Sequence, residues 1–372
     1  MKYPLLPYSQ LVYDMQQANS DVYTSEFVVR LNKEEVDVSR LKQAVEKAIR
    51  NHPVFSMHVD EYGMQEYVPP LDVMHGQYHS VNFKDDGKYI EVKVANNRIL
   101  GDGKSESIFI EDIVRAYKGL PLFPDAYITY LQHLEEKKHS PRYAADRQWL
   151  ETEFGSLSFP VHPKTDLPLG TADVSIEGVM TEDYSSLREN LHRLVSEQLI
   201  PLSAFFSLTA ALAMMEYNGC DETALTWAYE GRESQEEQHI YGSLHRDVPF
   251  KIKRSNDRKE LLKAARNQIR QGIAHSSYPF TLTYPHTEIW NYALNVLVQP
   301  SMRAKMELVP FHFEAVEPQN AQHMAYSLLD VEIYDEESLT LLYRYSATHY
   351  KEESIQKFAA LVRKYAVWLL EE

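Results

Sequence analysis

The segment from residue 89 to residue 118 constrains the fold more than any other part of this sequence. Apolar and polar residues alternate over residues 89–95, which predicts a strand with one buried face. A turn follows at Gly101-Asp102-Gly103, where glycine permits a tight turn that a side chain would block. Apolar residues then recur at helical spacing, which predicts a helix over residues 105–118. The sequence therefore predicts a strand and a helix joined by a tight loop that carries an aspartate.

Both halves of the chain mix strand and helix patterns, which predicts two α+β lobes. The expected strands are 27–31, 55–60, 89–95, 174–180, 225–229, 248–252, 294–298, 327–334 and 339–346. The expected helices are 38–51 (capped by Ser39), 105–118, 143–153, one that starts at 181–185, 203–217, 259–272 and 353–370. Residues 159–170 contain three prolines and a glycine, which predicts the lobe boundary there and domains of 1–165 and 166–372.

The strand–turn–helix segment resembles the signature of nonribosomal peptide synthetase condensation domains. That signature is His-His-x-x-x-Asp-Gly between a strand and a helix. Further blocks resemble the same family in the same order: 3–10, 41–59, 127–131, 147–150, 187–217 with 228–232, 241–249, 275–280 and 328–370. The resemblance implies two chloramphenicol-acetyltransferase-like lobes, each a mixed sheet with helices, that meet at a central tunnel.

The same resemblance implies a reaction and partners. In the family an amine attacks a thioester carried on phosphopantetheine, and an amide forms. The implied partners are an acyl- or peptidyl-carrier protein and adjacent synthetase domains, with no bound cofactor. Tyr229, Tyr241, His275 and Gln299 fall on family blocks and are the candidate tunnel residues.

Asn97, Arg98, Asp102 and Gly103 are the candidate active-site residues; Asp102-Gly103 matches the signature, but Asn97 and Arg98 depart from it. Counted back from Asp102, the two histidine positions fall on Asn97 and Arg98. The second histidine does the chemistry in the family, and its pKa near neutrality suits a proton acceptor. An arginine stays protonated and only donates hydrogen bonds. The resemblance therefore implies that amide formation is impaired or altered here.

Several roles stay open for Arg98. It could form a salt bridge that fills the site, bind a phosphate or carboxylate ligand, or stabilise a developing oxyanion. Ser56 stands where the family usually has an arginine that pairs with the motif aspartate. Asp102 is therefore expected to contact either Arg98 or an arginine from elsewhere, and Asn97 to bond the loop backbone. The rival to an altered acyltransferase is a non-catalytic module that recruits a carrier protein or a tailoring enzyme.

Composition narrows the class of protein further. The net charge of −16 argues against nucleic-acid or anionic-membrane binding. The single cysteine, Cys220, excludes an internal disulfide and fits a reducing compartment. The first ten residues do not resemble a signal peptide, and the apolar stretch 200–215 is too short to cross a bilayer. We expect a cytoplasmic protein. His75 and His79 lie four apart, but zinc needs a further ligand, and Gly76 argues against the helix that would place both on one face.

Overall fold

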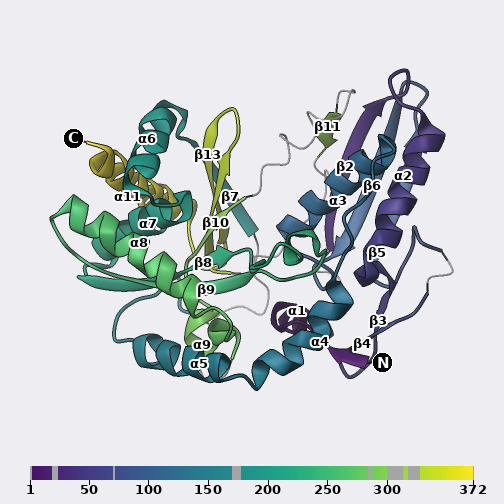
Figure 1. The fold of residues 1–372 in the computed structure, drawn as a ribbon. Coiled ribbons are helices and arrows are strands. Elements are labelled where there is room, and N and C mark those ends of the chain that lie inside the picture. The colour runs from purple at the N-terminus through teal and green to yellow at the C-terminus, as the bar shows by residue number, and fades with distance from the viewer. Residues whose placement is uncertain are drawn as a thin grey trace. The chain divides into compact units, whose positions relative to one another are not determined.

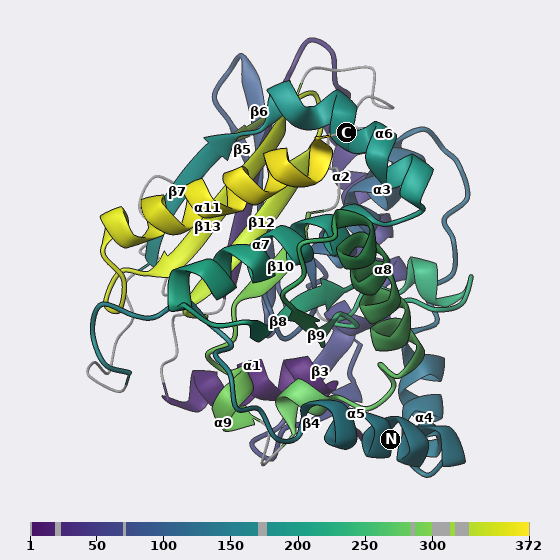
Figure 2. The same ribbon diagram turned by 90° about the vertical axis from the view of Figure 1, so that its left-hand side faces the viewer.

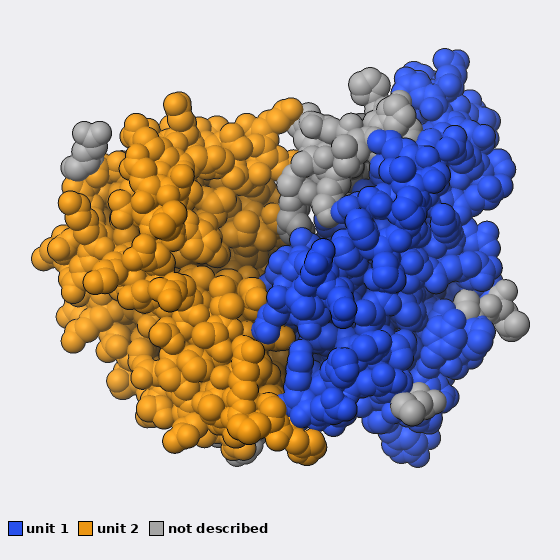
Figure 3. Space-filling view, in the orientation of Figure 1, with its two compact units in different colours: residues 1–138, 230–245, 300–321 blue, residues 139–229, 246–299, 322–372 orange. Residues whose placement is uncertain are grey.

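The computed structural model describes residues 2–18, 24–69, 72–169, 177–283, 287–299, 313–316 and 327–371. Contacts divide the chain into two compact units (Figure 3). Unit 1 comprises residues 1–138, 230–245 and 300–321, and unit 2 comprises 139–229, 246–299 and 322–372. The predicted boundary at residue 165 is a single point in the sequence, whereas these units exchange segments. The division into compact units therefore does not test the predicted lobe boundary at residue 165, which stays a prediction.

Unit 1 contains a four-stranded antiparallel sheet in the order β11-β2-β6-β5. Its strands are β2 (Thr24–Asn32), β5 (His79–Asp85), β6 (Tyr89–Asn97) and β11 (Phe313–Val316). A small antiparallel sheet adds β1 (Lys2–Pro4), β3 (Met57–Val59) and β4 (Met64–Tyr67). The helices are α1 (Pro7–Ala18), α2 (Val38–Asn51), α3 (Gly103–Tyr117) and α4 (Tyr127–Lys138), with short 3-10 turns at Pro53–Ser56 and Glu237–His239. Helices α2 and α3 run side by side along the larger sheet (Figure 1).

Unit 2 contains a six-stranded mixed sheet in the order β7-β13-β12-β10-β8-β9, in which β10 is parallel to β8 and β12. Its strands are β7 (Glu177–Asp183), β8 (Glu222–Tyr229), β9 (Arg246–Lys253), β10 (Asn295–Val298), β12 (Leu329–Asp335) and β13 (Leu339–Ser346). Its helices are α5 (Pro141–Phe154), α6 (Arg188–Gln198), α7 (Leu202–Asn218), α8 (Arg258–Ala274), α9 (Thr287–Trp290) and α11 (Glu352–Leu370), with 3-10 turns at Ser185–Leu187 and Phe280–Leu282. Helices α7, α8 and α11 cover one face of this sheet (Figure 2).

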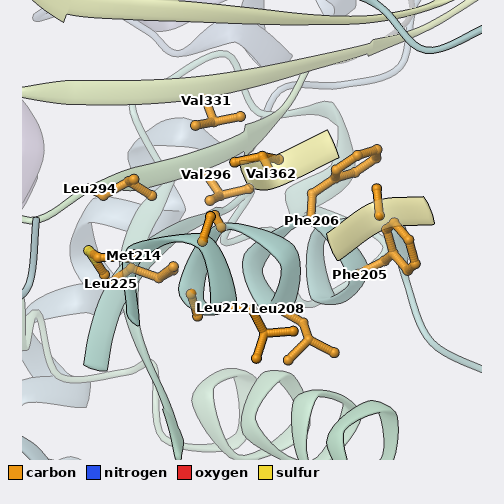
Figure 4. Packing of buried hydrophobic residues seen from close by; sticks show 14 of the residues in the cluster. Phe205, Phe206, Leu208, Leu212, Met214, Leu225, Leu294, Val296, Val331 and Val362 are labelled. Atoms are coloured by element: carbon orange, nitrogen blue, oxygen red, sulfur yellow. The ribbon is translucent and has the colours of Figure 1, made fainter. Parts of the chain in front are cut away.

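Helix α7 lies at the centre of the core of unit 2. Residues 204–215 are buried along its whole length, because almost every side chain there is apolar or small. Phe206 lies near Val362 of α11, whereas Leu208 and Leu212 point to the opposite side of α7 from Val296 (Figure 4), and all of them belong to one buried cluster. The helix ends at Gly219, whose φ of +69° lies in the left-handed region that favours glycine.

Local signals mark the elements well but misplace some ends. Helix α2 spans the predicted residues, but the prediction that Ser39 caps it is wrong. Asp37 is the cap, and its side chain accepts a hydrogen bond from the Arg40 backbone N–H at 3.0 Å. The predicted helix start at 181–185 is also wrong, because β7 continues to Asp183 in register with β13. Residues 174–176 of the strand predicted there lie outside the described residues.

No single helix among the described residues is long and apolar enough to cross a membrane. Residues 185–198 and 202–218 together pass a test of length and composition, but they are bent by 108° at the break between them.

Candidate functional site

The turn after β6 is fixed by hydrogen bonds to its own backbone. Asn97 is buried, and its side-chain oxygen accepts from the Ile99 backbone N–H at 3.0 Å. The Leu100 N–H donates to the Asn97 carbonyl, and the buried Ser9 hydroxyl donates to the Ile99 carbonyl at 2.8 Å. The prediction that Asn97 bonds the loop backbone is confirmed. Arg98 lies in this turn with an exposed side chain.

Asp102 caps the start of helix α3 and satisfies one of its first free amides. Its Oδ1 accepts from the Ser105 N–H at 2.9 Å, and the Ser105 hydroxyl accepts from the Asp102 N–H at 3.2 Å. This reciprocal pair is a capping box, in which each side chain satisfies the backbone of the other. The carboxylate also lies where the helix dipole favours negative charge. Gly103 is the exposed first residue of the helix.

Asp102 forms a buried ion pair with Arg232. Two guanidinium nitrogens of Arg232 donate to the two carboxylate oxygens, each at 3.0 Å. The arginine side chain is 0% exposed and the aspartate side chain 5%. The prediction that Asp102 contacts an arginine is confirmed, and the partner is the arginine from elsewhere in the chain; the interpretation that assigned this role to Arg98 is wrong. Burial alone would raise the pKa of Asp102, but the charge and hydrogen bonds of Arg232, together with further contacts such as the Ser105 N–H, outweigh it and lower that pKa.

The ion pair also holds the backbone of residues 240–245, which we call the clamp segment. Asp102 Oδ2 accepts from the N–H groups of Leu244 and His245, both at 3.0 Å. The Ser105 hydroxyl accepts from the Gly242 N–H at 3.1 Å, and Arg232 donates to the Gly242 carbonyl at 3.0 Å. The Asp102 carboxylate therefore caps the start of a helix, neutralises a buried arginine and holds a segment that is distant in the sequence.

Tyr241 of the clamp segment packs beneath the loop. Its ring is 1% exposed, and its hydroxyl accepts from the Asn96 side-chain amide at 3.0 Å. Burial raises its pKa far above the ordinary tyrosine value. A Cβ atom on Gly101 would lie 2.6 Å from this ring and 2.9 Å from the Ser105 Cβ. Gly101 is therefore required by the close approach of Tyr241, as the predicted tight turn implied.

The arrangement is a rigid loop whose aspartate is structural. The side chains of Asn97, Asp102 and Ser105 all bond the backbone around them. Among the described residues there is no group of three or more His, Cys, Asp or Glu that could hold a metal ion. His75 instead bonds Asp72 at 2.8 Å, and His79 bonds the Val73 carbonyl at 3.0 Å.

Comparison with known proteins decides the family. The family profile described as "Condensation domain" matches residues 98–366, which is more than half of the chain. The chain belongs to the condensation domain family. A search of curated proteins found no significant match.

Solved structures of condensation domains and their relatives share this fold. The first is the EpoB cyclization-docking bidomain of a nonribosomal peptide synthetase from Sorangium cellulosum, with 15% identity, a TM-score of 0.78, and coverage of 100% of this chain and 86% of that chain. The epimerization domain from the third module of tyrocidine synthetase B has 16% identity, a TM-score of 0.78 and coverage of 100% and 96%. The condensation domain of the Monacolin K polyketide synthase MokA has 13% identity, a TM-score of 0.79 and coverage of 100% and 98%. The predicted α+β fold of two lobes is confirmed; the tunnel stays a prediction.

Three tunnel candidates of this condensation domain lie in unit 2. Tyr229 is half-buried at the end of β8. His275 Nδ1 bonds the Asp146 carboxylate at 3.0 Å, and the His275 ring stacks on Trp149. Gln299 donates to a carboxylate oxygen of Glu332 at 2.7 Å. These contacts fit packing and local anchoring, and their tunnel role, like that of Tyr241, stays a prediction.

Sequence reasoning missed two residues that build the loop of this condensation domain. Ser105 stands three positions after the capping aspartate, and this Asp-x-x-Ser spacing at a helix start could have identified it. Arg232 lies 130 residues from its partner, and it belongs to the Glu-Gly-Arg block at 230–232. No local signal in the sequence links that block to Asp102, so only the fold identifies the pair.

Proposed function

We propose that this chain is a condensation-domain protein of nonribosomal peptide biosynthesis whose ancestral reaction is impaired or altered. That reaction joins a carrier-bound acyl thioester and an amine into an amide. One observation supports the proposal above all. The Asp102 loop is fully built and anchored, but Asn97 and Arg98 stand at the two positions that resemble the signature histidines.

Neither residue can take the proton that an attacking amine must lose. The Arg98 guanidinium stays protonated at any pH at which the protein is folded. The Asn97 amide is not a base, and its oxygen already accepts from the loop backbone. Any remaining acceleration would come from holding the two substrates together, which can lower a barrier without a base.

The intact scaffold also favours a second candidate function, the recruitment of a carrier protein or a tailoring enzyme without catalysis. Arg98 places a permanent, exposed cation in the turn. A guanidinium suits the phosphate of phosphopantetheine, to which it can donate two parallel hydrogen bonds. Substrates in either case would be carried on phosphopantetheine, and the partner would be an acyl- or peptidyl-carrier protein.

One assay separates the two functions. The protein is mixed with a carrier-bound acyl donor and a carrier-bound amine, and the amide is followed by intact-protein mass spectrometry. We expect little or no amide from the natural protein and more from Arg98→His. Robust amide formation by the natural protein that Arg98→Ala abolishes would refute the proposed impairment. Arg50→Ala is the matched control, because Arg50 is an exposed arginine of α2 that pairs with Glu46, four residues away.

A binding measurement with the loaded carrier protein completes the design. The recruiting module would be supported if the protein forms no amide but still binds the carrier, and if Arg98→Ala weakens that binding. Absence of both amide and binding would refute both candidate functions.

A further inference from the structure

A second buried ion cluster lies in unit 1, around His52. The His52 side chain is 0% exposed, and both of its ring nitrogens face carboxylates. Nδ1 lies 2.7 Å from Asp125 Oδ2, whose side chain is also 0% exposed. Nε2 lies 3.3 Å from Asp112 Oδ2, and the Asp112 side chain is 5% exposed.

The two carboxylates on either side of the ring favour its protonated form. A neutral imidazole has one donor nitrogen and one acceptor nitrogen, whereas an ionised carboxylate only accepts. With either neutral tautomer, one lone pair of His52 would face a carboxylate oxygen in a buried site. A ring protonated at both nitrogens bonds Asp125 through Nδ1 and places the Nε2–H in ionic contact with Asp112 at 3.3 Å, a contact without the geometry of a hydrogen bond. The Asp112 oxygen also accepts from the Asn51 side-chain amide at 2.8 Å, so that carboxylate is oriented independently of His52.

Asp125 connects His52 to the clamp segment. The oxygen that faces His52 also accepts from the Tyr241 backbone N–H at 2.9 Å. The Tyr241 hydroxyl in turn accepts from Asn96, the residue before Asn97 in β6. The clamp segment is therefore held at both ends by buried carboxylates. Asp102 with Arg232 holds residues 244 and 245, and Asp125 with His52 holds residue 241.

The cations beside these two carboxylates differ in whether they can lose their charge. Arg232 keeps its charge at every pH of interest, but an imidazole can lose its proton near neutrality. Within the part of the chain that the structure describes, three titratable groups face His52: Asp112 from α3, Asp125 from the turn before α4, and Tyr241 from the clamp segment. The ring centroids of His52 and Tyr241 are 5.4 Å apart. The other rings in contact, Phe55 and Phe109, are apolar.

We propose that protonated His52 is a positioning residue that, through Asp125, anchors Tyr241 under the Asn97–Gly103 loop, and that loss of its proton releases this end of the clamp segment. The inference concerns the order of the loop and holds whether or not the chain makes amides.

The direction of titration agrees with the geometry. Burial alone would lower the pKa of His52, but the bonds to Asp112 and Asp125 and their charges raise it above the ordinary imidazole value. The raised folded-state pKa means that the stabilisation is complete below the unfolded value of about 6.5 and is lost as the pH rises through the folded pKa.

Two measurements on the full chain test this proposal. Isotope-labelled histidine followed by NMR, with His52→Gln used for assignment, reports the protonation of the ring. Hydrogen exchange of the peptide over residues 240–245 from about pH 6 to about pH 10, corrected for intrinsic rates, reports the anchoring. We expect a doubly protonated ring at the low end and exchange about tenfold faster once the proton is lost, which corresponds to one charge-assisted hydrogen bond.

Variants keep the test decisive if His52→Gln fails to fold. Asp112→Asn leaves His52 and Asp125 in place but removes one carboxylate, so both midpoints should move together to lower pH. His75→Gln is the control, because His75 also bonds an aspartate but lies on the surface, and it should move neither midpoint. A neutral His52 at about pH 6, or exchange of residues 240–245 that does not follow the His52 midpoint, would overturn the proposal.

Discussion

The Asp102–Arg232 pair gives the most direct test of how this loop is held. Asp102→Asn keeps the size of the side chain and an oxygen that can still cap α3, since Asn and Asp cap about equally well. It removes the charge that faces a guanidinium with 0% exposure. Breaking a buried pair from one side costs about 3–5 kcal/mol because the other charge is left uncompensated. We expect a loss of unfolding free energy of that size.

Urea unfolding followed by circular dichroism measures the change as a shift in midpoint at constant slope. Asp37→Asn is the matched control, because Asp37 caps α2 through the same bond to a third-position amide. It should cost less than about 0.5 kcal/mol. Removing both charges, in Asp102→Asn with Arg232→Met, should recover much of the loss.

The pH dependence follows from the lowered pKa of Asp102. Its stabilisation is present above the unfolded carboxyl value of about 3.9 and is lost as the pH falls through the lower folded value. The difference between the natural protein and Asp102→Asn should therefore shrink in acid. If Asp102→Asn and Asp37→Asn cost the same at neutral pH, the buried pair does not hold the loop and the reasoning fails.

Three further predictions concern single positions. Gly101→Ala should cost about 1–3 kcal/mol in urea unfolding, because the new methyl would press on Tyr241 and Ser105; an unchanged midpoint would contradict this close approach. Leu199→Gly should raise the unfolding free energy by about 0.5 kcal/mol, because Leu199 is 76% exposed with φ of +50°; a loss would show that its side chain packs. Burial and nearby carboxylates raise the pKa of Asp330 to about 7, so its ionisation disfavours the fold as the pH rises from about 4 to about 7. Asp330→Asn should therefore stabilise the protein by about 1–2 kcal/mol at about pH 8 and by nothing near pH 4; a pH-independent effect would contradict this sign.

The sequence predicts the elements of this fold where local signals are strong. Helix α2 and strand β13 span the predicted residues, because apolar periodicity is clear in both. The end of β7 differs from the prediction, because Thr181-Glu182-Asp183 resembles a helix start until the pairing with β13 is known. A strand end decided by its neighbour cannot be inferred from its own residues.

The candidate site divides in the same way. The turn, the capping aspartate and the role of Asn97 follow from residues close together in sequence. The partner of Asp102 and the bond from Asp125 to Tyr241 join segments more than 100 residues apart. Such contacts depend on how the chain returns to unit 1, and no spacing rule contains that information.

Because Asp102 has several structural roles, the presence of this aspartate in another sequence does not by itself indicate catalytic activity. A chain that gives up the chemistry of this loop is still under pressure to keep the aspartate, because its replacement strands a buried arginine, uncaps a helix and frees two amides of residues 244 and 245. Loss of activity therefore need not be accompanied by substitution of this aspartate. The aspartate is a marker of architecture, and an inactive descendant would carry it as faithfully as a working enzyme.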